Sequence, residues 1–299
     1  MPASAATLIL GRGGGALRGR FPGRVDVREE GAVPAALERA GCLVLADATC
    51  PRQEAMRALE LADRAGAALW VHAAILPVLA QAGVLPRRLG TIPFYCFDGL
   101  RRRRVWPVER LSPLVALLAL PLALPALALL ALRVWLTDGR PVVFAQSRVG
   151  RRGRRFTIFK FRTMRSGGEE APRRRVTGAG ERLRRHGLDE LPQVFNLLLG
   201  SMAWIGPRPL PVDEHPAGNG ADAWMKVREQ VLPGLTGLYQ ICPGRRELGL
   251  AEMCILDAYW MHNRSPRLNA WIVMRTAVAM FRGWGRDAGK LGSAKVLKS

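Results

Sequence analysis

Apolar and polar positions divide this chain into three regions with different patterns. In residues 1 to 105, "ATLIL", "CLVLADA" and "AALWVHA" are short apolar runs typical of buried strands. Between the last two, "PRQEAMRALELADRAG" has the spacing of an amphipathic helix that ends at Gly66. Strand, helix and strand in this order predict a parallel βαβ unit. We therefore expect this region to form a small α/β domain.

The second region is a long apolar segment at residues 106–138. No charge occurs from Pro113 to Leu132, a length of about 20 residues that is nominally enough to cross a bilayer. Pro121 and Pro125 interrupt the helix within this run, and arginines flank both of its ends, whereas a crossing helix should show a charge asymmetry. We predict a re-entrant membrane helix that breaks at proline and returns to the same side. A kinked transmembrane helix and a buried soluble helix are the alternatives.

The third region, residues 139–285, is globular and rich in arginine, and a basic tail follows at 286–299. The predicted fold class is α/β, with a small Rossmann-like N-terminal domain and a mainly α, membrane-associated catalytic domain. "GRGGGA" after the first strand, with Asp26 further on, spells a weak dinucleotide fingerprint, and the arginine-rich "LRGRFPGR" favours a degenerate domain that binds no nucleotide. The apolar stretch at 267–286 suits either the lipid interface or the core.

The composition of the chain limits the kinds of partner that it is expected to bind. Lys and Arg total 45 against 24 Asp and Glu, a formal charge of +21, which predicts a polyanionic neighbour. Aromatic residues are only 7% of the chain, and no metal-finger spacing or RNA-binding pattern occurs, so we expect no nucleic-acid partner. Five scattered cysteines indicate reduced thiols in a cytosol-facing protein, and the N-terminus shows no secretory signal.

Two adjacent carboxylates stand out in "RRHGLDELPQVFNLLLG". Its apolar spacing predicts an amphipathic helix ending near Gly200, and Pro192, tolerated only in a first helical turn, places the start near Asp189. Asp189 and Glu190 would then lie at a helix N-terminus, where they could simply cap the helix. Because arginines surround them, they could instead bind Mg²⁺ and a diphosphate, and a carboxylate can attack phosphorus.

Basic residues on other segments could bind the same diphosphate. Alternation in "FTIFKFRTM" puts Lys160 and Arg162 on one face of a strand, where they could hold a diphosphate or merely face solvent. In "IGPRPL" two prolines should hold Arg208 on a stiff, extended loop. "LPGLTGLYQICPGRREL" ends in a further arginine pair, Arg245 and Arg246.

Three stretches together resemble one family: "VVFAQSRVGRRGRRFTIFKFRTM", "LRRHGLDELPQVFNLLLGSMAWIGPRPL" and "PGLTGLYQI". In order and spacing they are similar to the bacterial sugar transferases that initiate polysaccharide assembly, the monotopic polyprenyl-phosphate phosphoglycosyl transferases. The resemblance covers roughly residues 108–285. It implies transfer of a sugar 1-phosphate from a UDP-sugar to polyprenyl phosphate, with Mg²⁺, at the cytosolic face of the bacterial inner membrane.

The resemblance also implies roles for individual residues. Asp189 would be the nucleophile that forms a phosphosugar intermediate, and Glu190 would hold Mg²⁺ with it or assist the acceptor. The remaining positions around the diphosphate are Lys160, Arg162, Arg184, Arg208 and Arg245. The re-entrant helix would contain Pro113, Pro121 and Pro125, in contact with inner-membrane lipids. Homodimerisation is left open.

The chain departs from the family's usual residues at several positions. Ser201 stands where an aspartate is usual, Asn269 where an aspartate is common, and His186 begins a pair that replaces two small hydroxyl residues. "QICPGRR" is one residue longer than usual, so Arg245 and Arg246 compete for one family position. Two other functions therefore stay open: a module that binds a nucleotide sugar or NAD through "GRGGGA", and a non-catalytic membrane scaffold.

Overall fold

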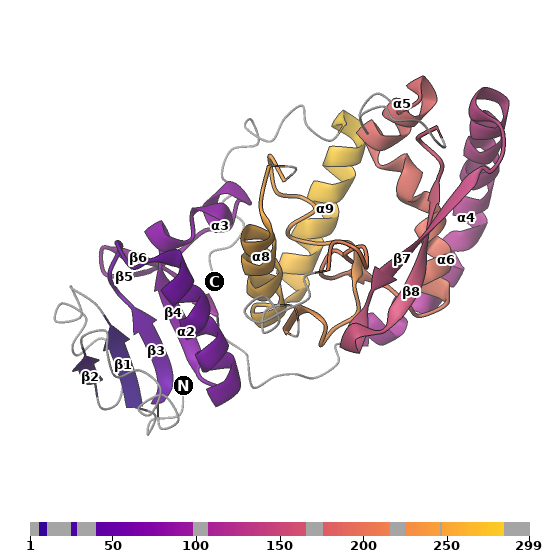
Figure 1. Ribbon diagram of the computed structural model, residues 1–299. Helices are drawn as coiled ribbons and strands as arrows, with labels where there is room; N and C mark the ends of the chain where they lie inside the picture. Colours follow the sequence, from indigo (N-terminus) through magenta and orange to yellow (C-terminus); the bar gives the residue numbers. More distant parts are fainter. Residues whose placement is uncertain are drawn as a thin grey trace. The chain divides into compact units, whose positions relative to one another are not determined.

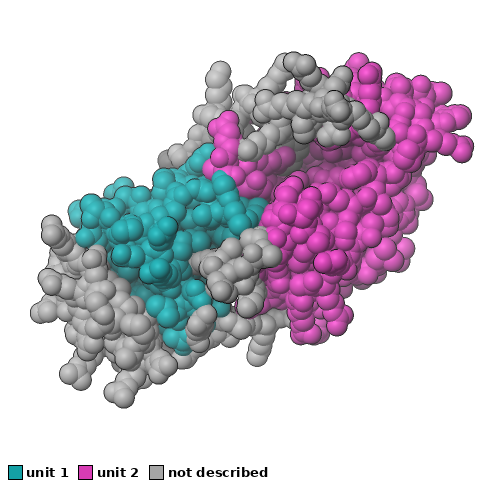
Figure 2. Space-filling model, in the orientation of Figure 1, with its two compact units in different colours: residues 1–104, 249–268, 293–299 teal, residues 105–248, 269–292 magenta. Residues whose placement is uncertain are grey.

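A computed structural model describes residues 6–10, 25–28, 40–97, 107–165, 176–215, 225, 227–245 and 247–283. The chain separates into two compact units (Figure 2). Unit 1 comprises Met1–Arg104, Gly249–Leu268 and Ser293–Ser299, and unit 2 comprises Val105–Leu248 and Asn269–Gly292. The grouping differs from the expected ranges chiefly at Gly249–Leu268, a segment expected in the catalytic domain that groups with the N-terminal region.

Unit 1 contains a six-stranded sheet in the order β2-β1-β3-β4-β6-β5 (Figure 1). Strands β1 to β4 pair in parallel, and β6 is antiparallel to both of its neighbours. The strands are β1 Ala6–Leu10, β2 Val25–Arg28, β3 Ala40–Leu45, β4 Ala68–His72, β5 Arg87–Leu89 and β6 Ile92–Phe97. Helix α2 (Arg52–Ala65) joins β3 to β4 and ends at Gly66 in the left-handed conformation, which confirms the predicted parallel βαβ unit. "GRGGGA" lies outside the described residues.

A helix from late in the sequence completes the core of unit 1. Helix α8 (Leu250–His262) packs on α3 (Pro77–Gln81), which follows the short helix η2 (Ala73–Ile75), and on β6. The ring of Tyr259 meets the rings of Tyr95 and Phe97 edge-on, at centroid distances of 6.2 and 5.7 Å. The side chain of Asn263 donates a 2.9 Å hydrogen bond to the carbonyl of Cys96. These contacts explain why residues 249–268 belong to unit 1.

The apolar segment of unit 2 forms one long helix, α4 (Pro107–Asp138), with three prolines inside it. Its mean hydropathy reaches 2.6 and only 11% of its most apolar window is buried, so it has the length and composition to enter a membrane. Leu118, Leu122 and Leu129 are among its exposed side chains, whereas Ala116 and Val134 face the core. The helix runs through all three prolines as one α-helix, so the predicted break at proline is not observed, whereas the return to the same membrane side stays a prediction.

The rest of unit 2 places short elements around a common core (Figure 1). Strands β7 (Val143–Val149) and β8 (Arg155–Phe161) form an antiparallel hairpin whose turn contains the short helix η3 (Arg151–Gly153). The other elements are α5 Gly178–His186, η4 Leu188–Gln193, α6 Val194–Leu198, β9 Ala203–Ile205, β10 Gly234–Thr236 and α9 Pro266–Arg282, whose first residues belong to unit 1. Strand β9 pairs with β10, and Trp204 on β9 donates to the carbonyl of Ser112 near the start of α4.

The carboxylate-bearing segment departs from the predicted geometry. Residues Leu188–Gln193 form a 3₁₀ helix, and the α-helix begins only at Val194, so the prediction of one α-helix starting near Asp189 is wrong. Pro192 has no backbone N–H to give, and it lies in the tighter segment just before the α-helix instead of in its first turn. The predicted end is close to the observed one, since α6 stops at Leu198 and Gly200 adopts a left-handed φ of 68°.

Candidate active site

The two carboxylates follow a sharp reversal of the chain. Helix α5 ends at Gly187, whose φ of 67° lies in the left-handed region that glycine enters at little cost. Its N–H bonds the carbonyl of Arg184, and the N–H of Glu190 returns to the carbonyl of Gly187 at 3.3 Å. This turn, and not an α-helical N-terminus, presents Asp189 and Glu190 to a pocket of about 1580 Å³ in unit 2.

A buried asparagine ties the helix behind the carboxylates to the strand that carries Lys160. Asn196 on α6 accepts from the N–H of Phe159 at 3.1 Å and donates to the carbonyl of Thr157 at 2.6 Å. Both backbone groups belong to β8, so one side chain fixes α6 against that strand. Lys160 is the residue after Phe159, which sets its ammonium opposite Glu190.

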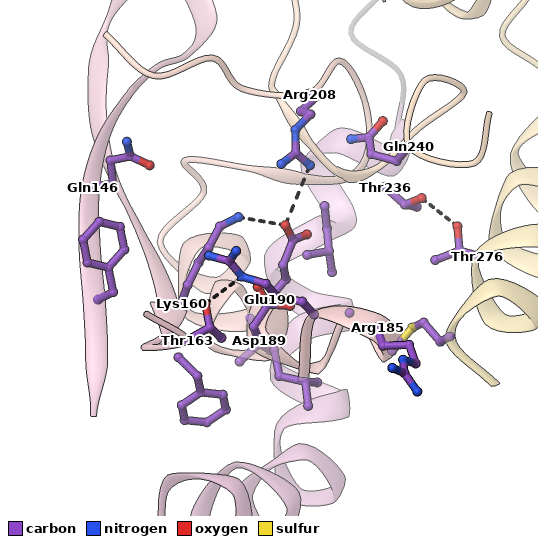
Figure 3. Close-up of a pocket in the computed structure, with 18 of the residues that line it drawn as sticks. Gln146, Lys160, Thr163, Arg185, Asp189, Glu190, Arg208, Thr236, Gln240 and Thr276 are labelled. Carbon is purple, nitrogen blue, oxygen red and sulfur yellow. Dashed lines mark hydrogen bonds and ion pairs between the residues drawn. The ribbon is translucent and has the colours of Figure 1, made fainter. Parts of the chain in front are cut away.

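Glu190 is held by two cations (Figure 3). Its Oε1 lies 2.8 Å from the Nζ of Lys160 and 3.7 Å from a guanidinium nitrogen of Arg208. Burial alone would raise the pKa of Glu190, but the charges of Lys160 and Arg208 outweigh it and lower the pKa to about 2. The Glu190 side chain is therefore a carboxylate at any physiological pH.

Asp189 has the opposite character. Burial, followed by the negative charge of Glu190, raises its pKa, and the cations Lys160 and Arg184 only partly oppose this. In the described part of the chain Asp189 is in no ion pair, whereas Glu190 is in two. A desolvated carboxylate without a cation clamped to it is the more nucleophilic of the two.

The neighbouring cations are themselves positioned. Burial lowers the pKa of Lys160, and the charge of Glu190 opposes that shift. The Nε of Arg184 donates to the hydroxyl of Thr163 at 2.8 Å, and Thr163 is buried. Because Arg184 also contributes to the field at Asp189, this hydrogen bond fixes a positive charge beside the less paired carboxylate.

The loop that carries Arg208 is supported by two buried arginines. Arg228 donates to the carbonyl of Arg208 at 2.7 Å, and Arg148 donates to the carbonyl of Pro209 at 2.9 Å. Backbone packing adds to this, because a methyl group on Gly234 would lie 2.0 Å from the backbone nitrogen of Gly206. The prolines on either side of Arg208 predicted a stiff loop; Arg148, Arg228 and the glycine contact are supports that no local pattern reveals.

All seven predicted site residues line this one pocket: Lys160, Arg162, Arg184, Asp189, Glu190, Arg208 and Arg245. Two of them are also bound to backbone carbonyls. Arg162 donates to the carbonyl of Arg140 at 2.6 Å, and Arg245 donates to the carbonyl of Gln240. The structure thus brings the predicted residues together. Arg246, the competing position, lies outside the described residues.

The three residues that depart from the family's usual ones all lie in unit 2. The Nδ1 of His186 lies 2.8 Å from the carbonyl of Met280, which links the end of α5 to α9. The hydroxyl of Ser201 donates to the carbonyl of Asn196 at 3.1 Å. Asn269 is buried in α9. None of these three residues lines the pocket, whereas the carboxylates and cations do.

The carboxylates can be tested against the expected Mg²⁺. Among the described residues no group of three or more His, Cys, Asp or Glu side chains could hold a metal. Mg²⁺, however, is usually bound through one or two carboxylates together with substrate phosphates and waters. Among the described residues Asp189 is in no ion pair and both ion pairs of Glu190 use Oε1, so the two side chains fit that smaller requirement.

The part of the chain that contains this pocket is similar to known proteins. The family model described as "Bacterial sugar transferase" matches residues 107–283, which include α4 and every pocket residue. Galactosyl transferase CpsE of Streptococcus agalactiae is 33% identical over 166 residues, which cover 50% of this chain and 36% of that protein. Exopolysaccharide production protein ExoY of Sinorhizobium fredii is 33% identical over 195 residues, covering 57% of this chain and 84% of ExoY.

A third relative is named for its reaction. The undecaprenyl-phosphate glucose phosphotransferase of Komagataeibacter xylinus is 35% identical over 210 residues, covering 57% of this chain and 40% of that protein. The chain thus spans most of ExoY but only about 40% or less of the other two relatives. Since the family model covers more than half of its residues and includes the whole pocket, this chain belongs to the bacterial sugar transferase family.

Proposed function

We propose that this protein transfers a sugar 1-phosphate from a UDP-sugar to polyprenyl phosphate, the first step in the assembly of a surface polysaccharide. The observation that carries the proposal is the pocket, in which Asp189, in no ion pair with the residues that the structure describes, lies beside Glu190, which Lys160 and Arg208 hold. Relatives named galactosyl transferase and undecaprenyl-phosphate glucose phosphotransferase support both the sugar and the lipid phosphate.

Asp189 is the nucleophile in this proposal. One carboxylate oxygen attacks the phosphorus that bears the sugar, the bond from that phosphorus to the UMP oxygen breaks, and UMP leaves with the electron pair. An oxygen of polyprenyl phosphate then attacks the same phosphorus and releases Asp189 as a carboxylate. Attack requires Asp189 to be ionised. In its desolvated environment the ionised carboxylate is more reactive than a carboxylate neutralised by an ion pair.

Glu190 and the cations hold the substrate while Asp189 reacts. Lys160 and Arg208 share Oε1 of Glu190, which fixes both cations where they can contact the diphosphate. Arg184 is held by Thr163, and Arg162 and Arg245 complete the basic lining. Asp189 and Glu190 would hold Mg²⁺ together with the diphosphate, and the ion would neutralise charge developing on the phosphoryl oxygens.

The long helix α4 supports a location at the bacterial inner membrane. Its exposed leucines give an apolar surface that can enter lipid, and Ala119 and Ala123 of the same helix line the pocket. A polyprenyl chain could therefore stay in lipid while its phosphate reaches Asp189. We propose a monotopic arrangement at the cytosolic face, with both ends of the helix on that side. Cysteines introduced at both ends of α4 should then be labelled from the cytosol, and labelling from opposite sides would refute it.

Unit 1 is proposed to be a degenerate Rossmann-like domain with a structural or regulatory role. The parallel order of β1 to β4 supports the comparison with nucleotide-binding folds.

The reaction can be tested with detergent-extracted protein, Mg²⁺ and a panel of UDP-glucose, UDP-galactose, UDP-N-acetylglucosamine and UDP-N-acetylgalactosamine. We expect at least one sugar to give about one UMP per protein without undecaprenyl phosphate and continuous UMP release with it. If no member of the panel releases UMP under either condition, the proposed function is wrong.

A further inference from the structure

A pair of threonine hydroxyls lies on the side of the pocket formed by α9 (Figure 3). Thr236 ends β10 and Thr276 lies on α9, and their Oγ1 atoms are 2.6 Å apart. The hydroxyl of Thr276 also donates to the carbonyl of Ile272, one helical turn earlier, at 2.8 Å. Both threonines line the same pocket as Asp189 and Glu190, yet the proposed chemistry makes no use of them.

The direction of these hydrogen bonds follows from counting protons. Each threonine hydroxyl has one proton to donate, whereas a backbone carbonyl can only accept. The proton of Thr276 is therefore used by Ile272, and the proton of Thr236 is used by Thr276. Thr236 Oγ1 is left with lone pairs and no proton, so toward a ligand it can act only as an acceptor.

The backbone holds this acceptor in a fixed place. The carbonyl of Thr236 accepts from the N–H of Gly206 at 2.9 Å, and Thr236 pairs with Ile205 in the β9–β10 register. A methyl group on Gly237 would lie 2.3 Å from the carbonyl oxygen of Gly206, so the two loops pack at backbone contact. Only 7% of Thr236 is exposed, so most of its surface is in contact with the rest of the protein.

The surroundings of the pair select the kind of group it can bind. Leu235, Val273, Ala277 and Met280, which also line the pocket, are apolar, and Gln240, which Figure 3 shows beside Thr236, is polar but uncharged. A phosphate at neutral pH offers mainly acceptor oxygens, which an acceptor-only hydroxyl repels and which the cations Lys160, Arg184 and Arg208 attract. An O–H or N–H of an uncharged group is the complementary partner of Thr236 Oγ1.

We propose that Thr236 Oγ1 accepts a hydrogen bond from a hydroxyl or amide N–H of the transferred sugar, and that Thr276 orients it to do so. The proposal rests on the proposed function, in which the sugar is bonded directly to the phosphate group attacked by Asp189. The ribose of the same substrate is separated from that phosphorus by a second phosphate. A neutral acceptor that shares the pocket with Asp189 is thus assigned to the sugar, and Thr236 becomes a specificity-determining residue.

The test is the isosteric Thr236→Val variant, with UMP release measured for each UDP-sugar and the Kd measured for UDP. Loss of one neutral hydrogen bond should lower kcat/KM for the preferred UDP-sugar by about 3- to 10-fold, and narrow its advantage over the others. The Kd for UDP, which lacks the sugar, should not change. Thr236→Ser, which keeps the hydroxyl, should restore most of the activity.

Two further variants complete the test. Thr276→Val keeps the packing but removes the acceptor that directs the Thr236 proton, so kcat/KM should fall while the Kd for UDP stays the same. Thr157→Val makes the same change on the exposed face of β8, outside the pocket, and should behave as wild type.

The outcomes separate the two proposals. If wild-type protein releases UMP and Thr236→Val keeps the same kcat/KM for every UDP-sugar, the assignment of Thr236 is wrong and the proposed function stands. If Thr236→Val weakens the binding of UDP as much as it lowers kcat/KM for the UDP-sugars, the hydroxyl binds the nucleotide or supports the fold. The assignment to the sugar is then also wrong. Absence of UMP release by wild type would instead overturn the proposed function.

Discussion

The two sides of the pocket in unit 2 differ in the chemistry they offer. One side carries the clustered charges of Lys160, Arg208 and Glu190, and the other carries the neutral pair Thr236 and Thr276 among apolar side chains of α9 (Figure 3). A diphosphosugar has the same division, with a charged diphosphate and an uncharged sugar. Under the proposed function, phosphate binding belongs to the charged side and sugar selection to the neutral side.

The two carboxylates show a similar contrast at closer range. Glu190 is ion-paired and its pKa is about 2, whereas burial and Glu190 itself raise the pKa of Asp189. Adjacent residues of nearly the same chemistry thus differ in ionisation because their neighbours differ. In the proposed reaction Glu190 positions cations and Asp189 reacts.

Replacing Asp189 should have the largest effect. Asp189→Asn keeps the size of the side chain but removes the attacking oxygen's charge, so UMP release should fall by a factor on the order of 10³ or more. The measurement is UMP formed per protein with the preferred UDP-sugar and Mg²⁺. Release within about tenfold of wild type would show that the nucleophile lies elsewhere and would remove the contrast between the carboxylates.

On the charged side, Arg208→Lys keeps the charge but loses the planar fork that can hold two phosphate oxygens at once. We expect kcat/KM for UMP release to fall about 10- to 100-fold, and the Kd for UDP to rise. Arg182→Lys is the matched control, because Arg182 is exposed on α5 and does not line the pocket. Equal effects of the two variants would argue against a specific phosphate contact at Arg208.

The pH dependence should show the influence of Glu190 on Asp189. Because Asp189 reacts as a carboxylate, UMP release falls as the pH drops through its raised pKa. In Glu190→Gln the like charge is gone, so the pKa of Asp189 falls and the acidic limb of the kcat/KM profile should move to lower pH. The quantity to compare is the pH at which kcat/KM falls, because the overall rate of UMP release will also drop in this variant. An unchanged or upward-shifted limb would contradict the coupling.

The smallest expected effect is on stability: Asp189→Asn should raise the melting temperature although it lowers activity. A carboxyl whose pKa is raised by folding binds its proton more tightly in the folded state, so the ionised form destabilises the fold above that pKa. Asp189→Asn should therefore melt slightly higher than wild type at neutral pH, and this advantage should disappear as the pH falls through the raised pKa. Differential scanning fluorimetry at several pH values would show it. A lower melting temperature at neutral pH would argue against a desolvated Asp189.

Much of the fold could be predicted from local patterns. The patterns around β3, α2 and β4 predicted a parallel unit, because continuous apolar runs, helical spacing and a C-terminal glycine are local signals. The uncharged run within α4 predicted a helix long and apolar enough to enter a membrane, and the observed helix has that length and composition. By contrast, α8 is apolar and almost entirely buried, and its assignment to unit 1 depends on contacts with Tyr95, Phe97 and Cys96, some 160 residues earlier in the chain.

The site was predictable to a similar extent. Asp189, Glu190 and the cations could be named because charged residues in apolar or proline-rich stretches are conspicuous. The 3₁₀ geometry of Leu188–Gln193 could not, since it follows from the left-handed turn at Gly187 and from the packing of Pro192. Arg148, Asn196 and the Thr236–Thr276 pair were missed because their roles arise from hydrogen bonds to distant backbone or helices.

The central claim, a covalent intermediate on Asp189, can be tested directly by intact-protein mass spectrometry. Wild-type protein would be mixed with Mg²⁺ and the preferred UDP-sugar in the absence of polyprenyl phosphate, then analysed before and after addition of the lipid. The account predicts a mass increase of one sugar phosphate, mapped to Asp189, that disappears when undecaprenyl phosphate is added and never forms in Asp189→Asn. UMP release without any adduct, or an adduct on another residue, would contradict it.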